Sequence, residues 1–477
     1  MPKSTTKMKL QHFRLFLILL WWSFSLPALA QQSMNLPLLS NWDDDNIPNA
    51  WTGAFSECWG YADNGREYAF LASTQGTYFF DITNPSEPQL IDFIRTKDTV
   101  TLVVNKDYAT YSHYLYAVSD QGDNSLQIFD LQYLPDSVVL AYDSDALSKR
   151  CHTLTVENNR LYMCSNTRPD NSFGAMDVFS LSDPLNPVLM GTLSNPGFFN
   201  VHEVFVRNDT AYCSNAYNGL WIYDMKFPAT PSLITIIEMY EEFGYNHSSW
   251  LTPDSKTLAF TDENHGKGVK LFDITDIHDP QFVGLVRSNL LQVADPLSDN
   301  GSMAHIPYIV GDVLLISYYH DGVVAFDISN PAQPKRIAWY DTHPQNTSYY
   351  SSAGCWGLYP FLPSGNIIAS DISNGLFIFD GTRILNYEPE IPSSPSVTVG
   401  PNPVHELLQI SVNAMANGNV HVQLFDMAGR LVLDESRELV AGKNSIPVTV
   451  NQLVEGIYVA KVETGFSNAT VKILKTE

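Results

Sequence analysis

The sequence contains little charge, and basic residues are its scarcest charged component. Charged residues make up 16% of the 477 residues, and 27 lysines and arginines stand against 51 aspartates and glutamates, for a formal net charge of −24. An acidic excess of this size repels nucleic acid and anionic membrane surfaces, whereas it attracts cations and keeps a protein in solution. We therefore expect no nucleic-acid partner.

Long apolar runs are absent after the first thirty residues. Four basic residues precede an apolar run at 15–22, and the small residues Ala28 and Ala30 come just before Gln31. This order is typical of a secretory signal peptide, and the run is too short to span a bilayer comfortably. The sequence predicts a cleaved signal peptide at 1–30, in preference to a membrane anchor, and no transmembrane segment after its removal.

Several active-site motifs are missing as well. The five cysteines include no Cys-x-x-Cys pair, so a cysteine-ligated zinc module is not expected. The sequence also lacks a Gly-rich phosphate loop, a Gly-x-Ser-x-Gly elbow and a His-Glu-x-x-His pattern. These absences argue against P-loop nucleotide binding, an α/β-hydrolase and a zincin protease.

What the chain has instead is a repeat of about fifty residues. Seven segments share an apolar run that ends in an aspartate or serine, and in the first six a proline-containing turn and a new apolar run follow. We expect the anchoring aspartates to cap their turns through the turn's own backbone. The anchoring positions, 44 to 54 residues apart, are Asp81, Asp130, Ser180, Asp224, Asp273, Asp327 and Asp380.

Each repeat is predicted to form four antiparallel strands. Turn pairs such as Asn218-Gly219 lie between the second and third strands, as in tight hairpins. Seven such units, none of which can bury its faces alone, are typical of a propeller. The sequence therefore predicts an all-β, seven-bladed β-propeller at 31–385. The stretch 36–42 is predicted to supply the missing fourth strand of the last blade and to close the ring.

The chain after the propeller has a different pattern. Residues 386–396 are rich in proline and serine, which indicates a linker. From 397 to 477, alternating apolar runs are separated by Gly-rich turns, which predicts a small immunoglobulin-like β-sandwich.

Both parts resemble known families. In the propeller, the Asp-x-x-Asn-Pro turns and stretches such as NVHEV (200–204), NHSSWLTPD (246–254) and GLFIFD (375–380) resemble the LVIVD-type repeat of secreted bacterial proteins. The order of the strand starts resembles that of the choice-of-anchor B proteins. This resemblance covers about residues 50–385, implies a propeller fold, and brings no settled reaction with it.

The tail resembles the type A sorting domain of the type IX secretion system of Bacteroidota. Such a domain implies contact with the type IX machinery, export to the extracellular space or the outer-membrane surface, removal of the tail and attachment to surface lipopolysaccharide. A fibronectin-like adhesive module is the alternative. The residues that carry the resemblance include Pro401, Asn402, Pro403, Gly429, Gly456, Tyr458, Lys472 and Lys475.

One column of residues recurs where the first strand of each repeat begins. In a propeller these positions face an axial funnel, where Glu57 and Glu203 would add carboxylates. Imidazoles and carboxylates suit a divalent metal or another ligand. The alternative is structural, because repeats reuse a residue that hydrogen-bonds a neighbouring blade at a crowded axis. The column comprises Trp59, His152, His202, His247, His305 and Trp356, with no clear member in the second repeat.

Two smaller clusters lead to narrower expectations. Cys58 and Cys355 are the best candidates for a disulfide, because the first and last blades meet near the axis. Asp262, Glu263 and His265 fall on a predicted hairpin, so we expect a solvated turn rather than a ligand set.

These observations together favour a secreted or cell-surface binding module for an unidentified extracellular protein or glycan. The alternative is a metal-dependent hydrolase or lyase that works in the funnel, where a divalent metal with an open position would activate water.

Overall fold

The chain consists of two units, Met1–Tyr387 and Glu388–Glu477. The predicted signal peptide at 1–30 and linker at 386–396 lie outside the residues that the structure describes, and every regular element within those residues is a strand. None of them belongs to a helix of the length and apolar character needed to cross a membrane. The computed structural model describes residues 33–50, 53–198, 200–350, 352–385, 397–400, 402–414, 418–427, 429–440, 442–465 and 468–476.

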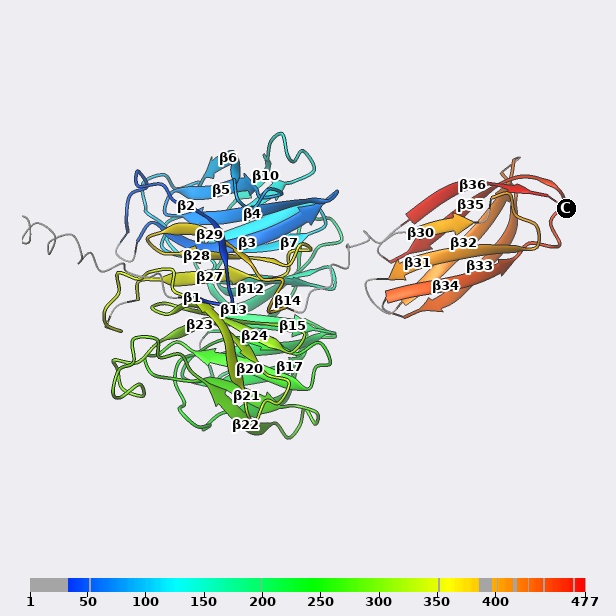
Figure 1. The fold of residues 1–477 in the computed structure, drawn as a ribbon. Coiled ribbons are helices and arrows are strands. Elements are labelled where there is room, and N and C mark those ends of the chain that lie inside the picture. The colour runs from blue at the N-terminus through cyan, green and yellow to red at the C-terminus, as the bar shows by residue number, and fades with distance from the viewer. Residues whose placement is uncertain are drawn as a thin grey trace, which may run out of the picture. The chain divides into compact units, whose positions relative to one another are not determined.

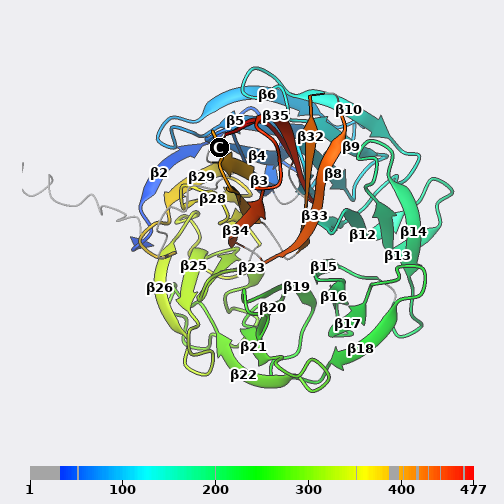
Figure 2. The ribbon, with the colours of Figure 1, turned by 90° about the vertical axis from the view of Figure 1, so that its right-hand side faces the viewer.

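The described part of the first unit contains seven antiparallel sheets, which follow one another around a ring (Figures 1 and 2). This propeller-like arrangement places the first strand of each sheet nearest the centre (Figure 2). The sheets are β3 (Phe55–Asp63), β4 (Arg66–Ser73), β5 (Gly76–Asp81) and β6 (Gln89–Arg95); β7 (Lys106–Tyr111), β8 (Tyr114–Ser119), β9 (Leu126–Asp130) and β10 (Val139–Ser144); β11 (Thr153–Glu157), β12 (Arg160–Thr167), β13 (Phe173–Ser180) and β14 (Val188–Leu193); β15 (Glu203–Arg207), β16 (Thr210–Ser214), β17 (Leu220–Asp224) and β18 (Ser232–Ile237); β19 (Asn246–Leu251), β20 (Thr257–Asp262), β21 (Val269–Asp273) and β22 (Gln281–Val286); β23 (Ala304–Val310), β24 (Val313–Tyr318), β25 (Gly322–Asp327) and β26 (Lys335–Tyr340), joined by β1 (Ser33–Met34); and β27 (Cys355–Tyr359), β28 (Asn366–Asp371) and β29 (Gly375–Asp380), joined by β2 (Leu38–Trp42).

The anchoring residues of the repeats act as the sequence predicts. In all seven, the side-chain oxygen accepts a hydrogen bond from the backbone N–H two positions later, at 2.8 to 3.2 Å. Ser180 does this with its hydroxyl at 3.2 Å, which explains why serine can replace aspartate there. In the first six sheets along the chain, the bond fixes the start of the turn between the third and fourth strands.

The ends of the ring are joined by strands from distant parts of the sequence. Strand β2 pairs antiparallel with β29, with Leu38 opposite Phe379 and Trp42 opposite Leu376. The Trp42 ring also reaches the next sheet, where its centroid lies 4.8 Å from that of Tyr78. The start of the first unit therefore links the last sheet to the first.

Strand β1 adds a contact that the repeat pattern does not predict. Ser33 and Met34 pair with Tyr340 and Trp339 at the outer edge of the neighbouring sheet. Asn35, at a positive φ of 54°, turns the chain between β1 and β2. The first ten described residues thus pair with two sheets.

Hydrophobic cores lie between neighbouring sheets. One core packs the fully buried Phe70 and Phe79 against Leu115 and Phe129 of the next sheet, and the centroids of Phe79 and Phe129 are 5.1 Å apart. The middle strands are buried on both faces, which is why they are almost continuously apolar. Each sheet therefore depends on its neighbours for burial.

The predicted disulfide is wrong. All five cysteines, each of which lies in a described segment, are buried and free. Cys58 pairs across the ladder with Leu71, whereas Cys355 pairs with Asp371. The two cysteines therefore occupy different levels of their sheets, because Cys58 is the fourth residue of β3 whereas Cys355 is the first residue of β27.

The second unit has two antiparallel sheets around one hydrophobic core (Figure 1). Leu408 and Ile410 of one sheet pack with Val422 and Leu424 of the other, and all four are fully buried. One sheet is ordered β30-β31-β34 and the other β33-β32-β35-β36. The strands are β30 (Val397–Gly400), β31 (Leu407–Ala414), β32 (Gly418–Asp426), β33 (Leu431–Leu439), β34 (Gly442–Thr449), β35 (Gly456–Thr464) and β36 (Asn468–Lys475).

The predicted sorting residues have structural roles in this unit. Asn402 joins the start of the unit to its last strand: its Nδ2 donates to the Lys472 carbonyl at 2.9 Å, and its Oδ1 accepts from the Leu474 N–H at 2.8 Å. Pro401 lies outside the described residues. The other predicted residues occupy turns or the last two strands: Pro403, Gly429, Gly456, Tyr458, Lys472 and Lys475.

Candidate functional site

The inner strands of the ring surround a cavity of about 500 Å³. Most of its lining comes from β3, β7, β11, β15, β19 and β23, and we call it the axial cavity. Because alternate side chains of a strand point to one side, each inner strand turns only a few residues toward the axis. The polar residues that converge there include Glu57, Asp107, Asp120, His152, His202, Glu203, His247, Glu263 and His305.

Four imidazoles form a continuous row on the wall of the axial cavity. Successive ring centroids are 4.2, 4.4 and 4.4 Å apart in the order His152, His202, His247, His305. Trp356 extends the row, with its centroid 4.8 Å from that of His305. The structure thus brings together the four histidines and the last tryptophan of the predicted column.

Hydrogen bonds orient the first two imidazoles. His152 Nδ1 lies 2.8 Å from Asp120 Oδ2, so this nitrogen carries the proton and donates to the carboxylate. His202 Nδ1 lies 3.1 Å from the Tyr245 hydroxyl, and the Nε2 atoms of the two histidines are 3.1 Å apart. With both rings neutral, Tyr245 donates to His202 and His202 donates to His152. One chain of hydrogen bonds therefore runs from the hydroxyl to the carboxylate.

The other two imidazoles differ in how they are held. His305 Nδ1 donates to the Trp356 carbonyl at 2.7 Å. His247 is buried, yet no described residue provides a hydrogen-bond partner for its Nδ1. Its two nitrogens lie between carboxylates, Nδ1 3.9 Å from Glu203 and Nε2 3.8 Å from Glu263. Both distances exceed hydrogen-bond length.

Three acids occupy one level of the wall beside the imidazoles. The residues that follow them, Cys58, Tyr108 and Val204, pair with Leu71, Ala117 and Cys213, which occupy equivalent positions in the second strands of their sheets. Glu57, Asp107 and Glu203 are therefore equivalent to one another. The ladder also identifies the column member of the second repeat that the sequence alignment leaves undefined: it is Lys106, the residue before Asp107.

Burial changes the protonation of these acids. It raises the pKa of Glu57 and of Glu203 well above the ordinary glutamate value, and the nearby charge of Asp107 raises both further. Burial also raises the pKa of Asp107 to about 6. The Glu203 side chain keeps 24% of its surface exposed, and Glu203 lines the cavity. These shifts favour the protonated form of the two glutamates, which can donate hydrogen bonds into the cavity.

Burial acts on the imidazoles in the opposite direction. It lowers the pKa of His305 to about 4, and it lowers the pKa of His202 and of His247 well below the usual imidazole value. The charges of neighbouring imidazoles lower the pKa values of His202 and His247 further. At neutral pH these rings are neutral, so their unprotonated nitrogens can accept hydrogen bonds or bind a metal.

Trp59 lies at a different level from the one that the sequence predicts. It pairs across the ladder with Phe70, its ring centroid lies 5.0 Å from that of Tyr359, and its Nε1 donates to Thr110 Oγ1 at 3.2 Å. The residue of the first repeat that is equivalent to His202 is Ser56, because Ser56 directly precedes Glu57 and His202 directly precedes Glu203. Both strands have a register shift at the same level, between Phe55 and Cys58 and between Cys355 and Leu358, but the Cys-Trp-Gly triplet follows the shift in β3 and begins before it in β27.

The prediction of a solvated turn at 260–266 is also wrong. Asp262 is buried and paired with Lys270, and His265 Nδ1 lies 3.0 Å from the Gly301 carbonyl. Glu263 lines the axial cavity, where its Oε1 accepts a hydrogen bond from the Tyr319 hydroxyl at 2.6 Å. Burial raises the pKa of Glu263. The hairpin is covered by long neighbouring loops, which the strand pattern does not reveal.

The second repeat has a buried lysine, Lys106, at the position where four other repeats have a histidine. It precedes Asp107 as His202 precedes Glu203, and it is 2% exposed. Burial lowers its pKa from 10.5 to about 8, although the charge of Asp143 acts in the opposite direction. The folded protein therefore binds fewer protons than the unfolded chain between these values, so this residue increases stability as pH rises through that window and decreases it at pH 7.

We expect Lys106→Met to increase the free energy of unfolding at pH 7 by about 3 kcal/mol, since one pKa unit corresponds to about 1.4 kcal/mol. The gain should shrink as pH rises from 8 to 10.5. Urea unfolding of both proteins across this range measures the difference, and Lys97→Met, at a side chain that is 40% exposed, is the control. A gain that is independent of pH would contradict the assignment.

Comparisons with known proteins concern mainly the second unit. Residues 398–476 match the secretion system C-terminal sorting domain. No curated protein matches the sequence.

Some solved structures are similar to part of this chain. PorZ, a surface component of the type-IX secretion system of Porphyromonas gingivalis, is 12% identical, with a TM-score of 0.47 over 88% of this chain and 59% of that chain. The extracellular domain of a hybrid two-component system of B. thetaiotaomicron is 12% identical, with a TM-score of 0.49 over 93% and 58%. The WD40 repeats of RRP9 are 11% identical, with a TM-score of 0.49 over 73% and 99%. This chain thus spans less than two thirds of the first two.

The sorting-domain match agrees with the motifs of the tail. It covers β31 to β36 and the Asn402 contacts that join the start of the unit to its last strand. The chain carries a type IX sorting domain, and the protein is exported by that system to the cell surface or the extracellular space.

Proposed function

We propose that this protein is a secreted or cell-surface binding module. In this proposal, residues 31–385 form a seven-bladed β-propeller of the LVIVD-repeat, choice-of-anchor B type, and its axial cavity takes a glycan. The immunoglobulin-like tail interacts with the type IX machinery and is removed, and the propeller attaches to surface lipopolysaccharide. The observation that carries the binding role is the axial cavity, in which neutral polar groups and aromatic rings converge.

The size and lining of the axial cavity support a glycan ligand. Its volume of about 500 Å³ lies within the range of small-molecule sites, which combine an apolar wall with a few placed polar groups. Protonated glutamates and neutral imidazoles match the hydroxyls of a sugar, which both donate and accept hydrogen bonds. The aromatic residues of the wall offer ring faces for the apolar side of a sugar: Trp59, Phe205, Trp250, Tyr308 and Trp356.

Charge favours a neutral ligand over an acidic one. The protein has a formal net charge of −24, and the acids of the axial cavity lie close enough to raise one another's pKa. A sialylated or sulfated glycan would bring a further negative charge into this environment and lose its hydration. Neutral glycans avoid both penalties.

A glycan screen tests this function. We expect the propeller to bind neutral oligosaccharides in preference to acidic ones, and Glu203→Ala to weaken that binding about tenfold, since a lost hydrogen bond in a closed site costs about 1.5 kcal/mol. Isothermal titration with the best oligosaccharide measures the affinity. Glu238→Ala, at an exposed residue outside the cavity lining, is the control and should bind as the unchanged protein does. Binding of peptides alone, or equal binding by Glu203→Ala, would rule out the proposed site.

A metal-dependent hydrolase or lyase in the same cavity is the second candidate. One observation favours it: His202, His247 and Glu263 can each direct a ligand atom toward a shared position. The same screen separates the two functions, because cleavage of a bound oligosaccharide supports the enzyme, whereas binding without any product supports the module.

A further inference from the structure

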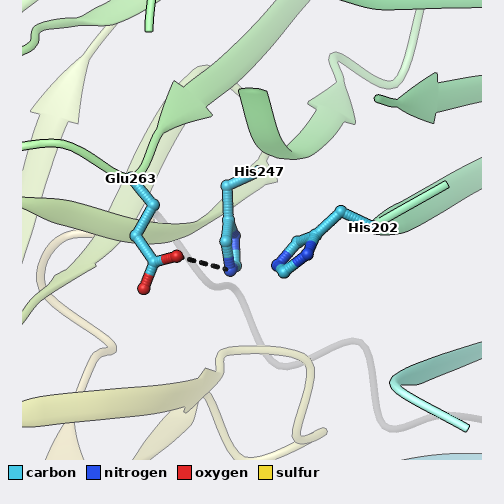
Figure 3. Close-up of side chains that lie close together, drawn as sticks. All are labelled: His202, His247 and Glu263. Atoms are coloured by element: carbon cyan, nitrogen blue, oxygen red, sulfur yellow. Dashed lines mark ion pairs between the residues drawn. The ribbon is translucent and has the colours of Figure 1, made fainter. Parts of the chain in front are cut away.

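Three side chains in the axial cavity come close to forming a coordination site. His202, His247 and Glu263 each offer one ligand atom, and these atoms all lie within 4.8 Å of one another (Figure 3). They come from separate places in the chain: the start of β15, the strand β19 and the residue that follows β20. The two rings and the carboxylate converge on one region of the wall (Figure 3).

The central member of this group has unused binding capacity. His247 is 4% exposed, and within the described residues its Nδ1 has no hydrogen-bond partner. Its Nε2 lies 3.8 Å from Glu263, which is too far for a hydrogen bond. A bound ion between Nε2 and the Glu263 carboxylate would bridge this gap, while Nδ1 remains directed toward Glu203 at 3.9 Å.

The other two members are oriented by hydrogen bonds to tyrosine hydroxyls. The Tyr245 hydroxyl lies 3.1 Å from His202 Nδ1, and the Tyr319 hydroxyl donates to Glu263 Oε1 at 2.6 Å. Residues that bind metals are commonly oriented by such outer partners through their second polar atom. The Oε2 of Glu263 remains available for an ion, whereas the Nε2 of His202, which lies 3.1 Å from that of His152, must exchange this hydrogen bond for the ion.

We propose that His202, His247 and Glu263 bind one divalent transition-metal ion of the zinc type, with a further coordination position open to the axial cavity. Two imidazoles and one carboxylate suit zinc, whereas calcium and magnesium prefer oxygen ligands alone. The open position lies where the proposed glycan binds, and the role of the metal is to coordinate a hydroxyl oxygen of that glycan. This role rests on the proposed function.

The spacing requires a small movement on binding. Ligand atoms around tetrahedral zinc are about 3.3 Å apart, given bonds of about 2.0 Å. The present separations of up to 4.8 Å must therefore contract. Because no described residue forms a hydrogen bond with His247 Nδ1, the contraction breaks no hydrogen bond of that atom.

Titration with zinc alone tests the inference on the full chain after treatment with a chelator. We expect one ion to bind and to raise the melting temperature, and magnesium to have no effect. His247→Ala and Glu263→Gln should each weaken zinc binding at least tenfold, which is the usual scale for loss of a ligand or its orienting partner. Glu263→Gln keeps the size of the side chain, so it remains informative if the histidine variant folds poorly.

The control is His343→Ala. This histidine lies 3.2 Å from Asp371 and does not line the axial cavity, so its removal should leave zinc affinity unchanged. Failure to bind zinc, or equal binding by both cavity variants, would overturn the site. Glycan binding is measured separately in chelated protein, so a failed metal site and a failed glycan site give different results: the first leaves oligosaccharide binding intact, and the second leaves zinc binding intact.

Discussion

Deletion of residues 398–477 is expected to stop the protein from reaching the cell surface and the medium. These residues contain the whole match to the sorting domain, which the type IX machinery must recognise. The second unit has its own hydrophobic core, so its removal should leave the first unit folded. The truncated protein should therefore accumulate as a folded protein in the periplasm.

Immunoblots of medium, surface and periplasmic fractions measure this effect, with thermal unfolding of the truncated protein as the control for folding. A second variant, Asn402→Ala, removes the two hydrogen bonds that join the start of the tail to its last strand. It should reduce export partially, because each such bond contributes only about 1 kcal/mol. Normal amounts of truncated protein in the medium would show that the tail is dispensable.

Trp42→Ala should give the largest loss of stability among single substitutions at the ring closure. The tryptophan lies at the end of β2, and its ring contacts Tyr78 and Phe80 of the next sheet at centroid distances of 4.8 and 4.7 Å. Truncation of a large aromatic side chain in a packed site costs about 3 to 5 kcal/mol, and the partial exposure of Trp42 places it near the lower end.

Equilibrium unfolding in urea measures this loss, and Phe227→Ala, at a side chain that is 67% exposed, should change stability by less than about 0.5 kcal/mol. Deletion of residues 33–42 should have a stronger effect. It exposes the edge of β29, and an exposed edge promotes association between copies. A monomeric deletion variant with unchanged unfolding would mean that β2 contributes little to the ring.

The all-β fold and its four-stranded sheets could be predicted because the same strand and turn pattern recurs in each repeat. An aspartate that caps its own turn, as Asp224 and Asp273 do, needs only local backbone, so the sequence pattern is sufficient. The pairing of β2 with β29 follows from a missing fourth strand in the last repeat. The pairing of β1 with β26 could not be predicted in this way, because the sequence pattern of the repeats does not show that the outer edge of β26 accepts a further strand.

Predictions at the candidate site were limited by register and by loops. Four histidines could be aligned since each opens a strand, whereas Trp59 was misplaced because the Cys-Trp-Gly triplet lies later in β3 than in β27. Asp107 lies in the one repeat whose strand start is unclear from the sequence. Glu263 lies on a hairpin whose burial depends on distant loops, and no short sequence pattern records such a contact.

The pairing of β2 with β29 has a consequence for the order of events after synthesis. Asn41 donates hydrogen bonds to carbonyl groups of Asn374 and Leu376, which lie more than three hundred residues later in the chain. Contacts of such large sequence separation form slowly, because a long loop must close before they contribute. During export the early sheets can form one after another, but β2 cannot pair with β29 until nearly the whole of the first unit has emerged. Until then β2 remains unpaired. During this interval the protein is most susceptible to proteolysis and to association with other copies.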